Sequence, residues 1–124
     1  MSAKRVLSVG QCFADHGAIV RALQKHCDAE VVSAATAYEA ATQLQQADFD
    51  LVLVNRVFDA DGASGLDFLS AIKGDETLRY LPVMLVSNYP EAQRQAVDLG
   101  AMPGFGKAGL DGPALIACVK AVLG

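Results

Sequence analysis

Several short apolar runs in the sequence are each followed by residues whose side chains could do chemistry. They are Gly10 and Gln11 after residues 6–9, Asn55 after 51–54, Ser87 after 83–86, and Lys107 after 104–106. If these positions meet, a hydroxyl, an amine and two amides face one another with no carboxylate among them. Such a group can form hydrogen bonds, but it provides neither a carboxylate nucleophile nor the hard oxygen ligands that Mg²⁺ prefers.

The apolar runs themselves predict buried strands. Residues 6–9, 51–54 and 83–86 are nearly continuous in Val, Leu and Met, which is typical of strands covered on both faces in a parallel sheet. Residues 31–34 and 104–106 are weaker, and we expect them to form edge strands.

Between the strands the apolar spacing changes to that of helices. Thr36 with Glu39 predicts a capping box, Ser64 an N-cap, and Gly74 and Gly100 helix ends. Pro90 suits the first turn of a fourth helix, and Asp111, Gly112 and Pro113 start a fifth. The predicted inward residues are Ile19, Ala22, Leu23 and Cys27; Ala37, Ala40, Ala41 and Leu44; Phe68, Leu69 and Ile72; Ala92, Ala96 and Leu99; and Leu115, Val119 and Val122. The fourth helix has little apolar bulk, so we expect it to be the loosest.

Strict alternation of strands and helices predicts an α/β fold, a (βα)5 doubly wound parallel sheet formed by residues 1–124 as one domain. In such sheets the ligand site lies beyond the carboxyl ends of the strands. That edge is where Gly10, Gln11, Asn55, Ser87 and Lys107 are expected to gather.

Composition excludes several function classes. The chain has 124 residues, 52% of them hydrophobic and 19% charged, with a net charge of −4. It has no basic run that would indicate nucleic-acid binding and no apolar stretch long enough for a membrane span. The N-terminal apolar stretch is too short for a signal peptide, so we expect a cytoplasmic protein. Cys12, Cys27 and Cys118 are widely spaced, which predicts three reduced thiols, with Cys118 packed in the core.

Other motifs are weak. Counting from Asp59, the EF-hand pattern would need Gly and Glu where Ser64 and Ser70 stand. His16 and His26 share no ligand spacing, and residues 10–17 match neither a dinucleotide fingerprint nor a P-loop. We therefore predict no metal and no cofactor.

With these positions in hand, the chain resembles the receiver domain of two-component response regulators from Arg5 to Leu123. Ser87 matches the family's hydroxyl position and Lys107 its lysine, with Phe105 at the usual aromatic switch position. Residues 65–69 match the segment that opens the third helix. The resemblance implies the strand order 2-1-3-4-5 of CheY-like proteins.

The departures from the family are concentrated in the phosphorylation site. Gly10 and Gln11 replace the acidic pair, and Asn55 replaces the acceptor aspartate. Ala108 follows Lys107 where the family has proline, which predicts a trans peptide and a loop rearranged around Gly109. The loop 56–64 is about two residues longer than the family pattern. We therefore expect a degenerate pseudo-receiver that is not an enzyme.

The loss of the acceptor carboxylate leaves Lys107 without its family partner. A charged amine held in a cleft needs a hydrogen-bonding or oppositely charged partner. Asp59 and Asp61 are the nearest carboxylates along the chain, and the Asn55 carbonyl or water would also serve.

Two other functions remain open. Asp59 or Asp61 could accept phosphate as an unusual acceptor, or the vacated pocket could bind a small ligand. The main hypothesis is a module that binds another protein, such as a histidine kinase or other signalling component, or a second copy of itself through helix four, strand five and helix five. Phe105, Tyr89 and Leu99 are the residues predicted for that face. With Gly124 as the last residue, we expect output to come through contact with another chain.

Overall fold

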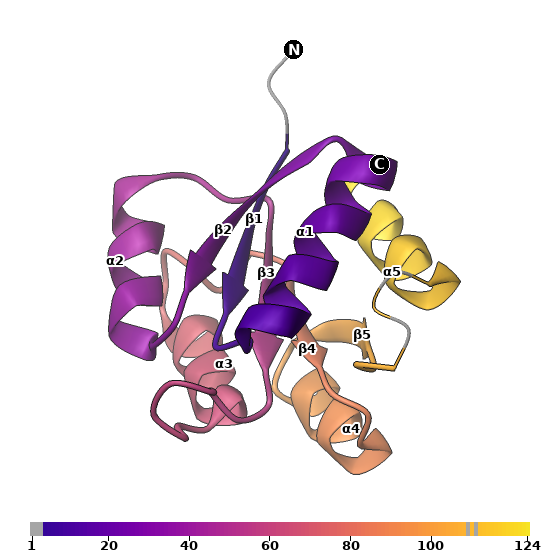
Figure 1. Cartoon of the computed structure of the whole chain (residues 1–124). Coiled ribbons are helices and arrows are strands. Elements are labelled where there is room, and N and C mark those ends of the chain that lie inside the picture. The colour runs from indigo at the N-terminus through magenta and orange to yellow at the C-terminus, as the bar shows by residue number, and fades with distance from the viewer. Residues whose placement is uncertain (1–3, 109, 111) are drawn as a thin grey trace.

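A computed structural model describes residues 4–108, 110 and 112–124. Its parallel sheet has the order β2-β1-β3-β4-β5, as predicted (Figure 1). The strands are β1 (Lys4–Val9), β2 (Ala29–Ala34), β3 (Leu51–Asn55), β4 (Val83–Val86) and β5 (Met102–Phe105). The predicted edge strands are β2 and β5. β2 begins two residues earlier than expected, and β5 ends at Phe105, before Gly106.

Helices cover both faces of the sheet, which confirms the doubly wound arrangement. One core cluster joins the sheet to α1 (Phe13–Cys27) and α5 (Pro113–Leu123). The other joins it to α2 (Ala37–Gln46), α3 (Gly65–Gly74) and α4 (Pro90–Asp98). No helix among the described residues combines the length and apolarity that a membrane span requires.

Alternate residues of the central strands pack into the two core clusters on opposite faces of the sheet. Val6, Leu51 and Leu53 pack on the α1 and α5 side, whereas Leu7 and Val52 pack on the opposite side. All five are fully buried. Continuous apolar runs form these strands because each side of the sheet needs an apolar surface.

Side-chain caps fix two helix starts as expected. Thr36 Oγ1 accepts the Glu39 N–H at 3.2 Å, and Ser64 Oγ accepts the Asp67 N–H at 3.2 Å. The return bond of the predicted capping box is displaced by one residue, because Glu39 accepts from Ala35 N–H at 2.8 Å. Asp111, expected in the start of α5, lies outside the described residues; the helix begins at Pro113.

Some predicted inward residues are not buried. Ala37 and Ala41 are exposed, and Cys27, Leu44, Phe68 and Val122 are only partly buried. Leu99 is 39% exposed because α4 ends at Asp98 and Leu99 is its C-cap. The three cysteines are free; Cys118 is partly buried, at the margin of the core.

A polar side chain fastens α4 to the sheet. Gln93 Nε2 donates to Leu85 O at 2.9 Å and to Ser87 O at 3.1 Å, while its Oε1 accepts Gly104 N–H at 3.2 Å. Gln93 therefore joins α4, β4 and β5, and compensates for the small apolar face of this helix.

Candidate functional site

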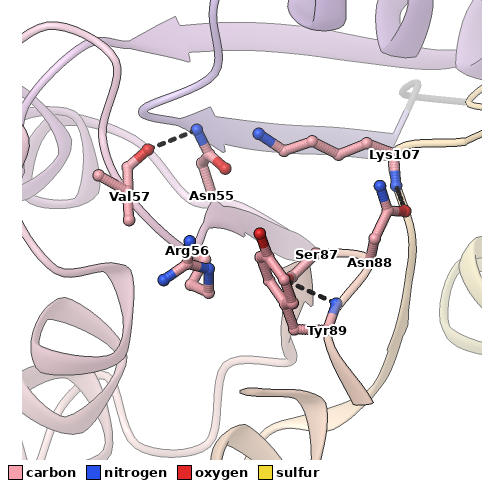
Figure 2. Close-up of a pocket in the computed structure, with 7 residues that line it drawn as sticks. All are labelled: Asn55, Arg56, Val57, Ser87, Asn88, Tyr89 and Lys107. Atoms are coloured by element: carbon pink, nitrogen blue, oxygen red, sulfur yellow. Dashed lines mark hydrogen bonds between the residues drawn. The ribbon is translucent and has the colours of Figure 1, made fainter. Parts of the chain in front are cut away.

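A pocket of about 330 Å³ lies at the carboxyl ends of β3 and β4 (Figure 2). Its lining residues are Asn55, Arg56, Val57, Ser87, Asn88, Tyr89 and Lys107. Three of the five predicted site residues, Asn55, Ser87 and Lys107, are thus brought together. Gly10 and Gln11 do not line the pocket.

Asn55 ends β3 and is only 3% exposed. Its Nδ2 donates to Gly10 O at 2.9 Å and to Val57 O at 2.6 Å. Two carbonyl acceptors fix the orientation of the amide, because only its nitrogen can donate to them. Oδ1 is buried and has no hydrogen-bond partner among the described residues. Figure 2 shows this oxygen on the side facing Arg56, Tyr89 and Lys107.

Gly10 is closed to any side chain by its conformation and by its neighbour. Its φ is +74°, a value that L residues rarely adopt. A Cβ there would overlap the ring of Phe58, which is 1% exposed. Phe58 therefore occupies the space beside the position where the family has its first acidic residue.

The long loop after β3 folds back to place Phe58. Phe58 N–H donates to Ala63 O at 2.9 Å, and Gly62 N–H returns to Phe58 O at 2.7 Å. Asp59 N–H donates to Gly10 O at 3.0 Å, so the Gly10 carbonyl accepts from both Asn55 and Asp59. Sequence reasoning noted the extra loop length but missed Phe58; the available signal was that Phe58 is the only aromatic residue in the sequence of the loop 56–64.

Gln11 is not among the residues that line the pocket. Its amide nitrogen and oxygen are buried, and neither has a hydrogen-bond partner among the described residues. Nearby in α1, burial lowers the pKa of His16, so this imidazole is neutral over a wider pH range than a solvated one. His16 is partly buried, whereas His26 is exposed.

The loops after β4 and β5 are held together by Asn88. Its Oδ1 accepts from Lys107 N–H at 2.7 Å and from Ala108 N–H at 3.2 Å. Ser87 Oγ, which is nearly buried, accepts from Tyr89 N–H at 3.1 Å. The Lys107–Ala108 peptide is trans, as predicted, and Gly109 lies outside the described residues.

Lys107 pairs with a carboxylate that the sequence did not indicate. Its Nζ lies 3.6 Å from Asp15 Oδ2 in the first turn of α1. The expected partners in the long loop are not used: Asp59 and Asp61 are exposed, and the Asp61 carboxylate accepts Ala63 N–H at 3.0 Å. Asp15 was missed because its approach depends on how α1 packs beside the β5–α5 loop.

Arg56 adds a second cation. Its guanidinium lies over the Tyr89 ring, 4.6 Å from the centroid, in a cation–π contact. Tyr89 is 57% exposed, whereas Arg56 is partly buried. Among the described residues, two cationic side chains and no carboxylate therefore line the pocket.

Phe105, predicted as a switch or packing residue, is buried. It is 5% exposed and belongs to the core cluster that includes α1 and α5. The ring therefore packs within that core and is not part of the exposed surface around α4 and β5. Tyr89 and Leu99 are exposed, as a contact residue must be.

The residues present do not fit the Mg²⁺ that the family uses. No group of three or more His, Cys, Asp and Glu side chains in the described part of the chain could hold a metal. Asn55 offers one amide oxygen, and Gly10 cannot be given a ligand without displacing Phe58. No step involving a metal is therefore assigned to this pocket.

Comparisons with known proteins place the fold. No family model matches the chain. It is 34% identical over 61 residues to chemotaxis protein CheY-3 of Vibrio cholerae serotype O1, which covers 49% of the chain and 44% of that protein. The chain thus spans less than half the length of this curated relative.

Two solved structures extend the likeness over nearly the whole chain. Chemotaxis response regulator CheY4 of Vibrio cholerae superposes with a TM-score of 0.77 at 21% identity, covering 98% of this chain and 100% of that one. The receiver domain of NtrX from Brucella abortus gives 0.80 at 23% identity, covering 95% and 97%. The chain therefore has the flavodoxin-like fold of CheY and of response-regulator receiver domains.

Proposed function

We propose that this chain is a receiver-like signalling module that does not accept a phosphoryl group and acts by binding another protein in a two-component or phosphorelay-type pathway. The observation that supports this best is the Asn55 amide, whose nitrogen donates to Gly10 O and Val57 O. A carboxylate at this position would have no proton to donate and would face both carbonyl oxygens. These contacts support a structural role for the Asn55 amide in place of a nucleophilic carboxylate.

The surroundings of Asn55 support the same conclusion. Phosphoryl transfer to a receiver needs a carboxylate oxygen as nucleophile and a Mg²⁺ ion, held by further carboxylates, that neutralises the transferring group. Phe58 fills the space beside Gly10, and Gln11 lies outside the pocket lining. Both requirements are thus unmet.

The rival function uses another carboxylate as acceptor. Asp59 and Asp61 are exposed on the loop after β3 and do not line the pocket. Asp15 is nearer, since it pairs with Lys107 at 3.6 Å. The rival therefore places phosphate on Asp15, Asp59 or Asp61.

The deciding experiment is incubation with Mg²⁺ and acetyl phosphate, followed by intact mass spectrometry. We expect no gain of mass corresponding to one phosphate. A phosphorylatable receiver treated in parallel shows that the donor is active. A gain that Asp15→Asn, Asp59→Asn or Asp61→Asn abolishes would overturn the proposal and name the acceptor.

The partner-binding face is proposed from the exposed apolar side chains around α4 and β5. Val97, Leu99 and Met102 are 43%, 39% and 37% exposed, and Tyr89 lies at the start of α4. A histidine kinase, another signalling component or a second copy of the chain would cover them. A pull-down that compares the wild-type chain with the Leu99→Asp variant tests this. We expect the variant to lose capture of the partner, and undiminished capture would exclude this face.

A further inference from the structure

We propose that the pocket at the carboxyl edge binds a phosphate group non-covalently and without a metal, and selects an anion that also carries a hydrogen-bond donor. This site goes beyond the protein-binding function proposed above. It rests on the charge, the donors and the one unpaired acceptor that the pocket presents.

The charge of the lining favours an anion. Lys107 and Arg56 are the charged residues of the lining. Asp15 offsets part of the Lys107 charge at 3.6 Å. Within the described residues no carboxylate lies within ion-pair distance of Arg56, whose planar fork suits phosphate oxygens.

Neutral donors complete the anion site. Ser87 Oγ accepts from Tyr89 N–H, which leaves its hydroxyl proton available. Asn88 Oδ1 accepts from Lys107 N–H and Ala108 N–H, which leaves Asn88 Nδ2 available to donate to a ligand. Figure 2 shows Ser87, Asn88, Arg56 and Lys107 around one space, with the Lys107 amino group extended toward Asn55.

The unpaired acceptor sets the selectivity. Asn55 is 3% exposed, and its Oδ1 has no partner among the described residues. The amide cannot be flipped to remove this oxygen, because Nδ2 is engaged with Gly10 O and Val57 O. A buried acceptor left without a donor is unfavourable. A ligand with an O–H group should therefore bind more tightly than one that presents only acceptor oxygens.

Hydrogen phosphate meets both demands, because it presents anionic oxygens to the cations and a P–OH to Asn55. Sulfate has the same shape but no proton. The pocket volume of about 330 Å³ is at the small end of the range for ligand sites, which suits a compact anion. A phosphate ester would need a carbon-bound hydroxyl to supply the donor, and its organic part has room in the adjoining hollow between Arg56, Leu66, Tyr89 and Ala92.

The test is isothermal titration of the intact chain with inorganic phosphate, sulfate and glycerol phosphate, at matched ionic strength with EDTA present. Phosphate should bind saturably, and roughly tenfold or more tightly than sulfate. Arg56→Ala and Ser87→Ala should each weaken phosphate binding by roughly tenfold, since bonds to a charged group are lost. Lys25→Ala, which removes an exposed cation at the far end of α1, is the matched control and should leave binding unchanged.

Glycerol phosphate distinguishes the two sources of the phosphate group: tighter binding than inorganic phosphate identifies an ester as the ligand, and weaker binding identifies the free ion. Thermal melts of each variant establish that it is folded. The proposal is overturned if phosphate shows no saturable binding, if sulfate binds equally well, or if Lys25→Ala weakens binding as much as Arg56→Ala.

Discussion

The ring of Phe58 lies in the space that a side chain at Gly10 would need. This relationship means that the pocket differs from an active receiver site in packing as well as in its missing carboxylates. Placing aspartates at Gly10, Gln11 and Asn55 together would return the missing carboxylates, but it conflicts with the packing of Phe58 against Gly10. The first two predictions test this.

Gly10→Ala should lower the free energy of unfolding by more than the cost of placing alanine at a left-handed φ. A left-handed φ costs a non-glycine residue roughly 1–2 kcal/mol, and overpacking adds about 1–3 kcal/mol. Gly62→Ala is the matched control, because Gly62 has a φ of +72° and open space around its Cα. Urea denaturation measures both. In a Phe58→Ala background the cost of Gly10→Ala should fall to that of Gly62→Ala; an unchanged cost would show that the ring is not the obstacle.

Asn55→Asp should also be destabilising, by roughly 1–3 kcal/mol or more, because the Val57 and Gly10 carbonyls lose the Asn55 donor and a carboxylate then faces both oxygens. The Gly10 carbonyl keeps only its bond from Asp59 N–H. Asn88→Asp changes the same atoms in the same pocket but keeps the oxygen that accepts from Lys107 and Ala108. We expect that variant to unfold close to the wild-type urea midpoint. Asn55→Asp should remain unphosphorylated by acetyl phosphate with Mg²⁺. Ready phosphorylation of that single variant would disprove the structural account of the pocket.

Millimolar Mg²⁺ should leave the melting temperature unchanged. A ligand stabilises a protein only through binding to the native state, and the described residues provide no set of carboxylates for the ion. Differential scanning calorimetry with Mg²⁺, with Ca²⁺ and with EDTA checks this. An increase that EDTA reverses would be the contrary result.

Gln93→Ala should loosen β5. It removes the donor to Leu85 O and Ser87 O and the acceptor for Gly104 N–H, for which the expected cost is about 1–3 kcal/mol. Gln95→Ala, on the exposed side of the same helix, should stay within about 0.5 kcal/mol of wild type. Hydrogen exchange at Gly104 should accelerate only in the Gln93 variant; equal rates in both variants would count against this role.

Partner binding should protect residues 88 to 122 from hydrogen exchange, with Phe105 at the margin of the protected region. The exposed Val97, Leu99 and Met102 lie in this range. Because the proposed module accepts no covalent phosphoryl group, its affinity for the partner should not change through phosphorylation on treatment with a phosphodonor. Protection confined to α1 and α2 would refute the assignment.

The fold was predictable because it depends on periodicity and on local caps. Runs such as residues 51–54 are apolar on both faces, and Ser64 accepts from Asp67 N–H where a helix was expected to begin. Asn55, Ser87 and Lys107 could be brought together from sequence because parallel strands end at one edge of the sheet.

The residues that sequence reasoning missed depend on tertiary packing. Phe58 and Arg56 belong to a loop whose path is fixed by bonds to Gly10 and Ala63, which periodicity does not indicate. Asp15 reaches Lys107 only because α1 lies near the β5–α5 loop. Gln93 is one of two glutamines in α4, and only the position of β5 distinguishes it from Gln95.

The interlocking of Phe58, Gly10 and Asn55 also constrains how this pocket could change by mutation. A carboxylate at either Gly10 or Asn55 alone meets a steric overlap or a pair of opposing carbonyls before any metal can bind. Each single substitution is therefore expected to lower stability without adding function, and a metal-binding pocket should require several changes made together, including one at Phe58. The mutational path from this pocket to a phosphorylatable one begins with a step that selection would oppose.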